Sequence, residues 1–304
     1  MTGSGATFGA VGRSQAALPG GRAPVGQETV VIEAGAGRRW SAIASLKSQL
    51  RELWRFRELL YFFVWRDIKV RYKQTVIGAA WALLQPLCAM AIFSLIFGRF
   101  AKMPSDGVPY PVFVYAGLLP WTFLANAVSQ ASLSLVNQAR LLTKVYFPRL
   151  FIPAATVGVG LVDFGLSFGV YVGLMLWYGH TPGISILLLP LLVVLTAMTA
   201  LGCGVLLASI TVVYRDFRIV VPFLVQVWLY LSPVVYPVTI IPEQYRWIMV
   251  LNPMTGIIAG FRAALLNRSP DWTALALATL LAAGILAVGV GYFRRTERRL
   301  ADIA

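Results

Sequence analysis

The stretch Ile184–Val213 reads ISILLLPLLVVLTAMTALGCGVLLASITVV and contains no charged residue. A helix rises about 1.5 Å per residue, so this stretch is long enough to cross about 30 Å of bilayer hydrocarbon. Comparable apolar stretches predict five further spans, near Trp81–Gly98, Val112–Val136, Leu150–Tyr178, Ile219–Val238 and Trp272–Phe293. We therefore predict an all-α integral membrane protein with six transmembrane helices.

The composition supports a membrane protein over a soluble one. Of the 304 residues, 58% are hydrophobic and 12% are charged, about half the charged fraction of a typical soluble domain. The net charge of +14 raises the question of nucleic-acid binding, but the basic residues flank apolar stretches instead of covering a polar domain. This pattern favours anionic lipid headgroups, and we expect no nucleic-acid partner.

The distribution of positive charge predicts the orientation. With the N-terminus inside, most of the 26 Lys and Arg residues fall on the cytoplasmic side, including the four basic residues of the C-terminus. This bias requires an even number of crossings and places both termini in the cytoplasm. The basic residues left on the outside are Arg99, Lys102, Arg246, Arg262 and Arg268.

The chain divides into a tail, an interfacial helix and a spanning domain. Residues 1–45 are predicted to be a flexible cytoplasmic tail. Residues 46–75 are predicted to form an amphipathic helix in the cytoplasmic interface, because polar and apolar residues recur at steps of three or four. The alternative is a helix packed on a soluble domain. The spanning domain covers residues 76–298, and residues 299–304 form a cytoplasmic C-terminus.

A seventh long apolar segment, Trp247–Leu266, contains helix breakers and a charge at Asn252-Pro253 and Arg262. We predict that it does not span, and that residues 239–268 form outer-side re-entrant gate helices between spans five and six. Backbone of this kind is tolerated at membrane depth only where protein or water covers it. The two prolines of Ser232–Pro237 are predicted to end or bend span five.

Several side chains are candidates for lining a path through the membrane. Asp163 is the one acid that we predict well inside a span, and such a carboxylate is a functional candidate by default. The alternative for Asp163 is a hydrogen-bonded residue that joins helices. The alternative for the aromatic residues of span five is an ordinary aromatic belt at the membrane interface. The predicted channel and gate residues are Asp163, Tyr171, Gln226, Tyr230, Tyr236 and Trp121.

The loop Asn137–Arg149 is polar and basic, which suits either a docking surface for a cytoplasmic partner or a loop that only sets orientation. Its candidate contact residues are Arg140, Lys144, Tyr146 and Arg149. The chain contains no GxxxxGK[ST] phosphate loop, no HExxH motif and no GxSxG motif. We therefore expect no catalytic site, no metal site and no cofactor in this chain.

Six motifs occur together in this chain and carry a family resemblance. They are Arg66–Thr75 (RDIKVRYKQT), Trp81–Pro86 (WALLQP), Gly117–Phe123 (GLLPWTF), Lys144–Arg149 (KVYFPR), Tyr214–Asp216 (YRD) and Ser232–Pro237 (SPVVYP) with Asn252-Pro253 behind it. From about Leu50 to Arg295 the chain resembles the permeases of polysaccharide ABC exporters, the Wzm-like and teichoic-acid-type export permeases.

The resemblance implies six transmembrane helices, an amphipathic N-terminal helix and outer gate helices in the bacterial cytoplasmic (inner) membrane. It also implies a homodimer with two copies of a separate ATP-binding subunit, which binds ATP and Mg and docks on the cytoplasmic side. The expected cargo is a polysaccharide linked to polyprenyl diphosphate. Docking would also involve Arg66 and Asp67, and the diphosphate would be attracted by Arg66, Lys69, Arg71 and Lys73.

Three alternatives remain. One is a permease of the same superfamily for teichoic acid, lipid or small hydrophobic compounds. A second is a stand-alone channel or ion-coupled transporter, which the scarcity of charge in the spans disfavours. A third is a membrane-bound glycan-transferring enzyme, for which the outer acids Asp106, Glu243 and Asp271 form no shared motif.

Overall fold

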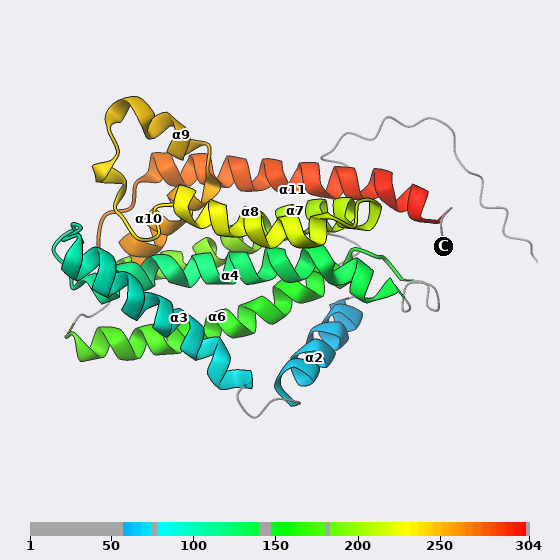
Figure 1. Cartoon of the computed structure of the whole chain (residues 1–304), viewed down its shortest axis with the longest axis horizontal. Coiled ribbons are helices and arrows are strands. Elements are labelled where there is room, and N and C mark those ends of the chain that lie inside the picture. The colour runs from blue at the N-terminus through cyan, green and yellow to red at the C-terminus, as the bar shows by residue number, and fades with distance from the viewer. Residues whose placement is uncertain (1–56, 74–77, 140–146, 180–182, 302–304) are drawn as a thin grey trace, which may run out of the picture. The chain divides into compact units, whose positions relative to one another are not determined.

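The computed structural model describes residues 57–73, 78–139, 147–179 and 183–301, and within these ranges all regular structure is helical (Figure 1). The short elements are η1 (Ser94–Phe100), η2 (Ile184–Leu188), η3 (Val238–Ile240) and η4 (Glu243–Tyr245). The α-helices are α2 (Arg57–Lys73), α3 (Gly78–Phe93), α4 (Tyr110–Asn137), α6 (Phe151–Trp177), α7 (Leu189–Val213), α8 (Phe217–Leu231), α9 (Arg246–Val250), α10 (Pro253–Leu265) and α11 (Trp272–Ala301).

Five helical segments are long and apolar enough to cross a membrane. They are Leu83–Phe100, Tyr110–Asn137, Phe151–Trp177, Ile184–Val213 and Trp272–Glu297. They correspond to the predicted first, second, third, fourth and sixth spans. The prediction of a multi-span helical membrane protein is therefore confirmed.

The predicted fifth span, Ile219–Val238, is wrong at its C-terminal end. Helix α8 stops at Leu231 after 15 residues, and the chain resumes as the 3-10 helix η3 at Val238. A helix of this length covers about 22 Å, less than the hydrocarbon thickness. Proline lacks a backbone N–H and restricts the residue before it, so Ser232-Pro233 ends the helix as the sequence predicts.

The outer segment between α8 and α11 contains a broken helix. Residues Glu243–Val250 and Pro253–Leu265 together are apolar and long enough to count as a sixth candidate span, but they are bent by 98° at the break. Every residue of α10 except Ala259 is buried, whereas α9 buries none. The predicted gate region 239–268 therefore consists of an exposed part and a part that belongs to the core.

Helix α4 forms the centre of the bundle. It packs against α3, α6, α7, α8 and α10, and every residue from Val112 to Trp121 is buried. Helices α7 and α11 also pack closely, because glycine lets their backbones approach. A Cβ atom at Gly202 would lie 2.7 Å from the backbone of Leu286, and one at Gly289 would lie 2.3 Å from the carbonyl oxygen of Gly202.

Two basic segments of the chain, α2 and the C-terminal part of α11, lie at the same end of the bundle. Figure 1 shows α2 and the C-terminal end of α11 at one end of the bundle, and α9 and α10 at the opposite end. The predicted tail of residues 1–45, and residues 46–56 of the predicted interfacial helix, lie outside the described residues. Helix α11 continues to Ala301, beyond Phe293, where the sixth span was predicted to end.

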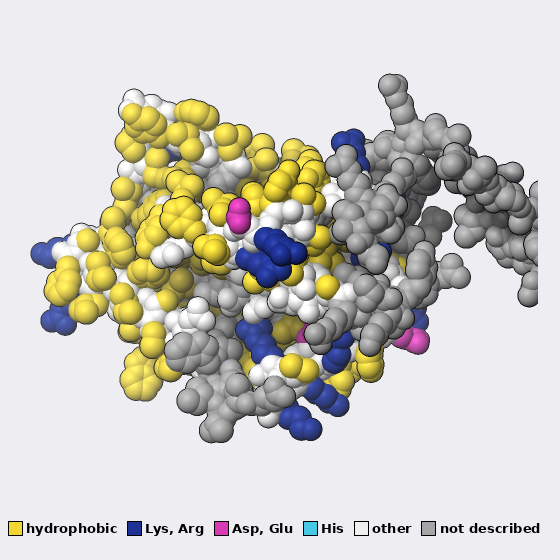
Figure 2. Space-filling model, turned by 45° about the vertical axis from the view of Figure 1, so that its right-hand side comes forward, with side chains coloured by type: hydrophobic (Ala, Val, Ile, Leu, Met, Phe, Trp, Pro, Cys, Tyr) yellow, Lys and Arg dark blue, Asp and Glu magenta, His cyan; other side chains and the backbone are white. Residues whose placement is uncertain are grey.

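Hydrophobic side chains cover the left and upper part of the face drawn in Figure 2, and Lys and Arg side chains lie at its centre, below the centre and at its left edge. The candidate span Leu83–Phe100, which joins α3 to η1, is the most exposed of the five. Leu84, Ile92, Leu95 and Ile96 are all exposed in the single chain. An apolar helix of this exposure needs lipid or another protein surface around it.

Candidate functional site

Asp163 joins the third candidate span to α2. Its carboxylate is buried on α6, its Oδ1 accepts a hydrogen bond from the Tyr72 hydroxyl, and its Oδ2 lies 2.8 Å from Nη1 of Arg71. Burial, and then the bond to this carboxylate, raise the pKa of Tyr72 to about 12. The acid that the sequence singled out is thus paired with a cation and a hydroxyl of α2.

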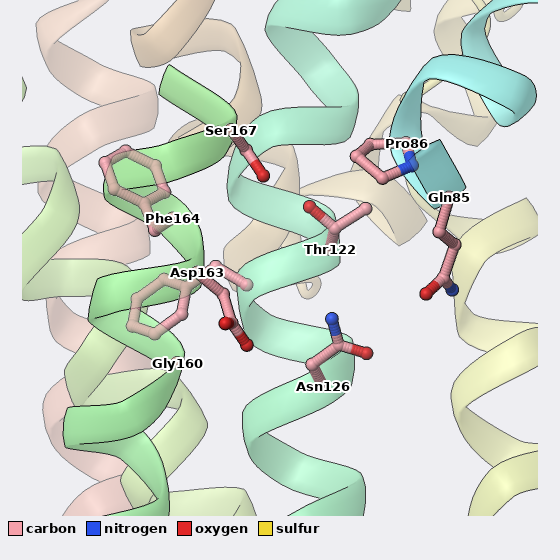
Figure 3. A pocket seen from close by; sticks show the side chains of 9 residues that line it. Gln85, Pro86, Thr122, Asn126, Gly160, Asp163, Phe164 and Ser167 are labelled. Atoms are coloured by element: carbon pink, nitrogen blue, oxygen red, sulfur yellow. The ribbon is translucent and has the colours of Figure 1, made fainter. Parts of the chain in front are cut away.

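A polar pocket lies beside Asp163, between α3, α4 and α6 (Figure 3). Its polar lining consists of Gln85 from α3, Thr122 and Asn126 from α4, and Asp163 and Ser167 from α6. Phe123 and Phe164 add aromatic surface. Amides, hydroxyls and a carboxylate in one hollow offer hydrogen-bond donors and acceptors to water or to a hydroxylated ligand.

The structure separates the six predicted channel and gate residues into three groups. Tyr171 is buried with its ring stacked on Tyr115, and Trp121 is buried edge-on against Trp228, so both lie inside the chain. Gln226 and Tyr230 are exposed on α8. Tyr236 is half-buried and belongs with this second group, because its hydroxyl donates to the carbonyl of Tyr230 over 3.0 Å. Asp163 forms the third group, at the pocket.

Helix α2 contacts both flanks of the predicted docking loop. Arg66 forms an ion pair with Asp67 at 2.8 Å, and its Nη2 donates to Oε1 of Gln138, beyond the end of α4, over 3.0 Å. Phe63 is the buried residue of α2, and its ring centroid lies 5.2 Å from that of Phe147, before α6. Of the predicted docking residues, Arg140, Lys144 and Tyr146 lie outside the described residues, whereas Arg149 is partly exposed.

The four basic residues predicted to attract a diphosphate differ in their surroundings. Arg66 and Arg71 each lie beside a carboxylate. Lys69 and Lys73 are exposed, and Nζ of Lys69 lies 5.3 Å above the ring of Trp65. Among these four residues, the two lysines therefore carry the most accessible positive charge.

The Ser232–Pro237 turn, which follows α8, is held by side chains from two other helices. Arg262 of α10 donates from Nη2 to the carbonyl of Val234 over 2.6 Å and from Nη1 to that of Tyr236 over 3.3 Å. The hydroxyl of Tyr110, at the start of α4, donates to the intervening carbonyl of Val235 over 2.6 Å. Three consecutive carbonyl groups that belong to no helix thus obtain partners.

Asn252 ties the same turn to the break between α9 and α10. Its Oδ1 caps α10 by accepting from the backbone N–H of Met254 at 3.0 Å, and also accepts from Nε1 of Trp228 at 3.0 Å. Its Nδ2 donates to Oγ of Ser232 over 2.9 Å and to the carbonyl of Leu231 over 3.2 Å. A single amide thereby satisfies the end of α8 and the start of α10.

Gly117 of α4 lies under the turn. A Cβ atom at this position would lie 2.8 Å from the carbonyl oxygen of Val234 and 2.9 Å from Nη2 of Arg262. Only glycine leaves room for that hydrogen bond. Two of the sequence motifs, Gly117–Phe123 and Ser232–Pro237 with its Asn252-Pro253 pair, therefore meet at one place in the fold.

Arg262 was read in the sequence as a residue that disfavours a span, and its contacts with the turn were not predicted. It is 8% exposed, its guanidinium carbon lies 3.8 Å from the centre of the Phe113 ring, and it forms no ion pair within the described part of the chain. The signal that could have found it is an arginine in the middle of an apolar segment. Within the described residues, no group of three or more His, Cys, Asp and Glu residues could hold a metal ion.

Comparison with known proteins identifies relatives that align with this chain over most of their own length. The chain is similar to the O-antigen export system permease protein RfbA of Myxococcus xanthus, with 33% identity over 226 residues, 73% of this chain and 86% of the relative. It is similar to RfbA of Klebsiella pneumoniae, with 26% identity over 81% of this chain and 95% of the relative. The polysialic acid transport protein KpsM of Escherichia coli is 25% identical over 77% of this chain and 92% of the relative.

Residues 58–266 match the ABC-2 type transporter family. This range begins in α2 and ends just after α10, so it contains the Asp163 contacts, the polar pocket and the Ser232–Pro237 turn. The protein belongs to the ABC-2 type transporter family.

Proposed function

We propose that this chain is the membrane-spanning subunit of an ATP-driven exporter that moves a polysaccharide linked to polyprenyl diphosphate across the bacterial cytoplasmic membrane. The observation that carries the proposal is the match to O-antigen and polysialic acid export permeases along 86% to 95% of those proteins. Five helices of spanning length support the membrane location.

We propose that both termini face the cytoplasm. Helix α2 and the C-terminal part of α11 lie at the same end of the bundle (Figure 1). This supports the orientation, because both segments are basic and basic segments favour the cytoplasmic side. In this orientation α2 lies in the cytoplasmic interface with Tyr61, Phe62 and Trp65 toward the lipid boundary, since all three are exposed. The bent pair α9–α10 is then the outer gate region.

ATP and Mg are bound by a separate ATP-binding subunit, present in two copies on a homodimer of this chain. The proposed docking surface is the loop after α4 together with Arg66 and Asp67 of α2. The hydrogen bond from Arg66 to Gln138 supports this surface, because it links α2 to the start of the loop. The exposed apolar face of α3 supports a second copy or lipid as its neighbour.

The mechanism that fits these contacts begins with attraction of the diphosphate to the cytoplasmic interface. Lys69 and Lys73 offer exposed charge, and each basic residue near such a surface contributes about 1 kcal/mol. Movement of the docking loop is transmitted to α2 through Gln138 and Arg66, and from α2 to α6 through Arg71, Tyr72 and Asp163.

Aromatic side chains on α8 would then contact the sugar chain, because a ring face packs on the apolar C–H edges of a sugar. Tyr230 is the exposed ring that best suits this role. Replacing Tyr230 with alanine is expected to slow export. Tyr171→Ala is the comparison variant, because it removes a buried ring of the core and not an exposed one. Normal export by Tyr230→Ala would mean that Tyr230 belongs to an interfacial aromatic belt and does not contact the sugar chain.

The test of the proposed function is isolation of the native complex, followed by analysis of lipid-linked glycans in cells that lack this chain. We expect an ATP-hydrolysing subunit to co-purify, and lipid-linked polysaccharide to accumulate in the cytoplasm. Transport by the purified chain without a nucleotide-hydrolysing subunit would contradict the proposal. Accumulation of a polyol-phosphate polymer or of a small lipid would favour the alternative cargo within the same family.

A further inference from the structure

Arg262 is a buried cation whose hydrogen-bonding partners are backbone carbonyls of another segment. A guanidinium removed from water is costly unless its N–H groups are satisfied. Here two of them are satisfied by the carbonyls of Val234 and Tyr236, and the face of the group lies on the ring of Phe113. Its Nε is buried without a hydrogen-bonding partner within the described residues.

We infer that Arg262 is a positioning residue for transport, which fixes the Ser232–Pro237 turn on α10 and α4. The role in transport rests on the proposed function, but the fixation of the turn does not. Because the turn has left α8, its carbonyls at residues 234 and 236 depend on Arg262 for a partner. If the turn moves away, three groups lose their partners at once, and one of them is a buried charge.

The chemistry of the contact requires arginine. The planar guanidinium offers separate N–H groups that reach two carbonyls two residues apart while its face rests on a ring. A lysine ammonium is a compact point charge on a flexible stem and does not reproduce this arrangement. Gly117 supplies an independent observation, because the space it leaves is the space that the Arg262–Val234 hydrogen bond occupies.

Fixation of the turn limits which part of the predicted gate region can move. The segment from Val238 to Leu251 lies between two anchored points, the turn held by Arg262 and the α10 cap formed by Asn252. Helix α9, inside this segment, buries no residue, whereas α10 is core. Any outward movement is therefore confined to residues 238–251, and α10 stays with the bundle.

The test measures the accessibility of the turn in the assembled exporter. Val235→Cys is introduced into a chain carrying Cys88→Ala and Cys203→Ala, and labelling by the membrane-permeant reagent N-ethylmaleimide is followed. Val235 is 6% exposed, so we expect slow labelling with Arg262 present. Arg262→Lys and Arg262→Met are both expected to label about tenfold faster, because hydrogen bonds from a charged group are among the stronger ones.

Two controls fix the interpretation. Arg268→Lys changes an exposed arginine that pairs with Asp106, and it should leave the thiol introduced by Val235→Cys protected. Tyr230→Cys, in the same chain without its two native cysteines, lies at an exposed position and should label quickly whatever residue is at position 262. Export is measured in parallel, and we expect it to fall in both Arg262 variants, with no rescue by lysine.

A second variant covers the case in which the Arg262 variants do not accumulate in membranes. Gly117→Ala intrudes on the same hydrogen bond without changing any charge, and it is also expected to expose the thiol introduced by Val235→Cys. Continued protection of that thiol in Arg262→Lys, or in Gly117→Ala where the arginine variants are lost, would overturn the inference. The labelling result does not depend on which compound is exported, so it separates this inference from the proposed cargo.

Discussion

Arg71 of α2 lies 2.8 Å from the carboxylate of Asp163 on α6, so a charge of the predicted interfacial helix pairs with the acid of the third candidate span. Tyr72, the next residue of α2, donates to the other oxygen of the same carboxylate. Two adjacent residues thus join α2 to the helix bundle. This connection fixes α2 to α6. Movement of the loop after α4 would therefore either move the two helices together or break these contacts.

The first prediction concerns the Arg71–Asp163 pair. Asp163→Asn and Arg71→Gln should each lower stability, because each removes the ion pair between the two side chains. Breaking a fully buried pair costs about 3–5 kcal/mol, and we expect about 1–3 kcal/mol here because the Arg71 side chain is 36% exposed. The measurement is the apparent melting temperature of the detergent-solubilised protein.

The double variant Asp163→Asn/Arg71→Gln completes the cycle. If the two residues act as a pair, its loss should be clearly smaller than the sum of the single losses. Strict additivity would mean that the ion pair contributes nothing, and that each residue acts through other contacts. The variant Asp163→Ala is less informative, because it also removes the acceptor of the Tyr72 hydroxyl.

The second prediction follows from the pKa of Tyr72, which rises from 10.0 to about 12. A pKa that is higher in the folded state means that the folded protein holds the phenolic proton more tightly. The stabilisation is then complete below pH 10 and is lost as the pH rises through 12. Tyr72→Phe should be less stable than the parent below pH 10, and the difference should shrink toward zero near pH 12.

The measurement is the difference in apparent melting temperature between parent and Tyr72→Phe across this pH range. Tyr61→Phe is the matched control, since Tyr61 lies on the same helix with 67% of its surface exposed. We expect no pH-dependent difference for the control. A Tyr72→Phe difference that is unchanged from neutral pH to pH 12 would show that the folded protein does not raise the pKa of Tyr72.

The apolar stretches predicted the five long helices, because length and hydropathy depend only on local sequence. The end of α8 was predictable in kind from Pro233 and Pro237, but the position of the break was not. Apolar residues continue through Val234 and Val235, so hydropathy extends the span to Val238 although the helix stops at Leu231. Local backbone chemistry overrode the hydrophobic pattern there.

The pairing of side chains was beyond prediction because it depends on packing. Asp163 was recognised as important, but nothing in the spacing indicates that its partners lie on α2. Trp121 and Tyr171 were predicted near a channel from their type and position, whereas in the single chain they pack against Trp228 and Tyr115. Arg262 was counted as an outside charge, and its burial follows only from the fold of α10.

The third prediction tests the close packing of α7 on α11. Gly202→Ala places a Cβ atom 2.7 Å from the backbone of Leu286, which cannot move aside as a flexible side chain can. Overpacking of this kind typically costs about 1–3 kcal/mol. Gly284→Ala on α11 is the matched control, because no atom lies within 4 Å of its added Cβ.

For the control we expect no loss and a gain of up to about 1 kcal/mol, since alanine is a better helix former than glycine. Thermal stability in detergent gives both values. Equal stability of Gly202→Ala and Gly284→Ala would mean that α7 and α11 are not in close contact in the folded protein.

The fourth prediction concerns the proposed docking surface. Reversing charge with Arg149→Glu and Lys144→Glu should weaken binding of the ATP-binding subunit and uncouple transport, while ATP turnover by that subunit alone persists. The reason is electrostatic: reversed charges repel a surface that the basic loop attracts, and the effect is strongest at low ionic strength. Co-purification of the two subunits and export are measured together, at low and high salt.

Arg246→Glu is the control for the docking variants, because Arg246 is an exposed arginine at the start of α9, at the opposite end of the bundle from α2. It changes the net charge of the chain by the same amount as Arg149→Glu. If docking is local to the loop after α4, Arg246→Glu should co-purify with the ATP-binding subunit as the parent does. Equal loss of co-purification in both variants would mean that net charge, and not this loop, governs the association.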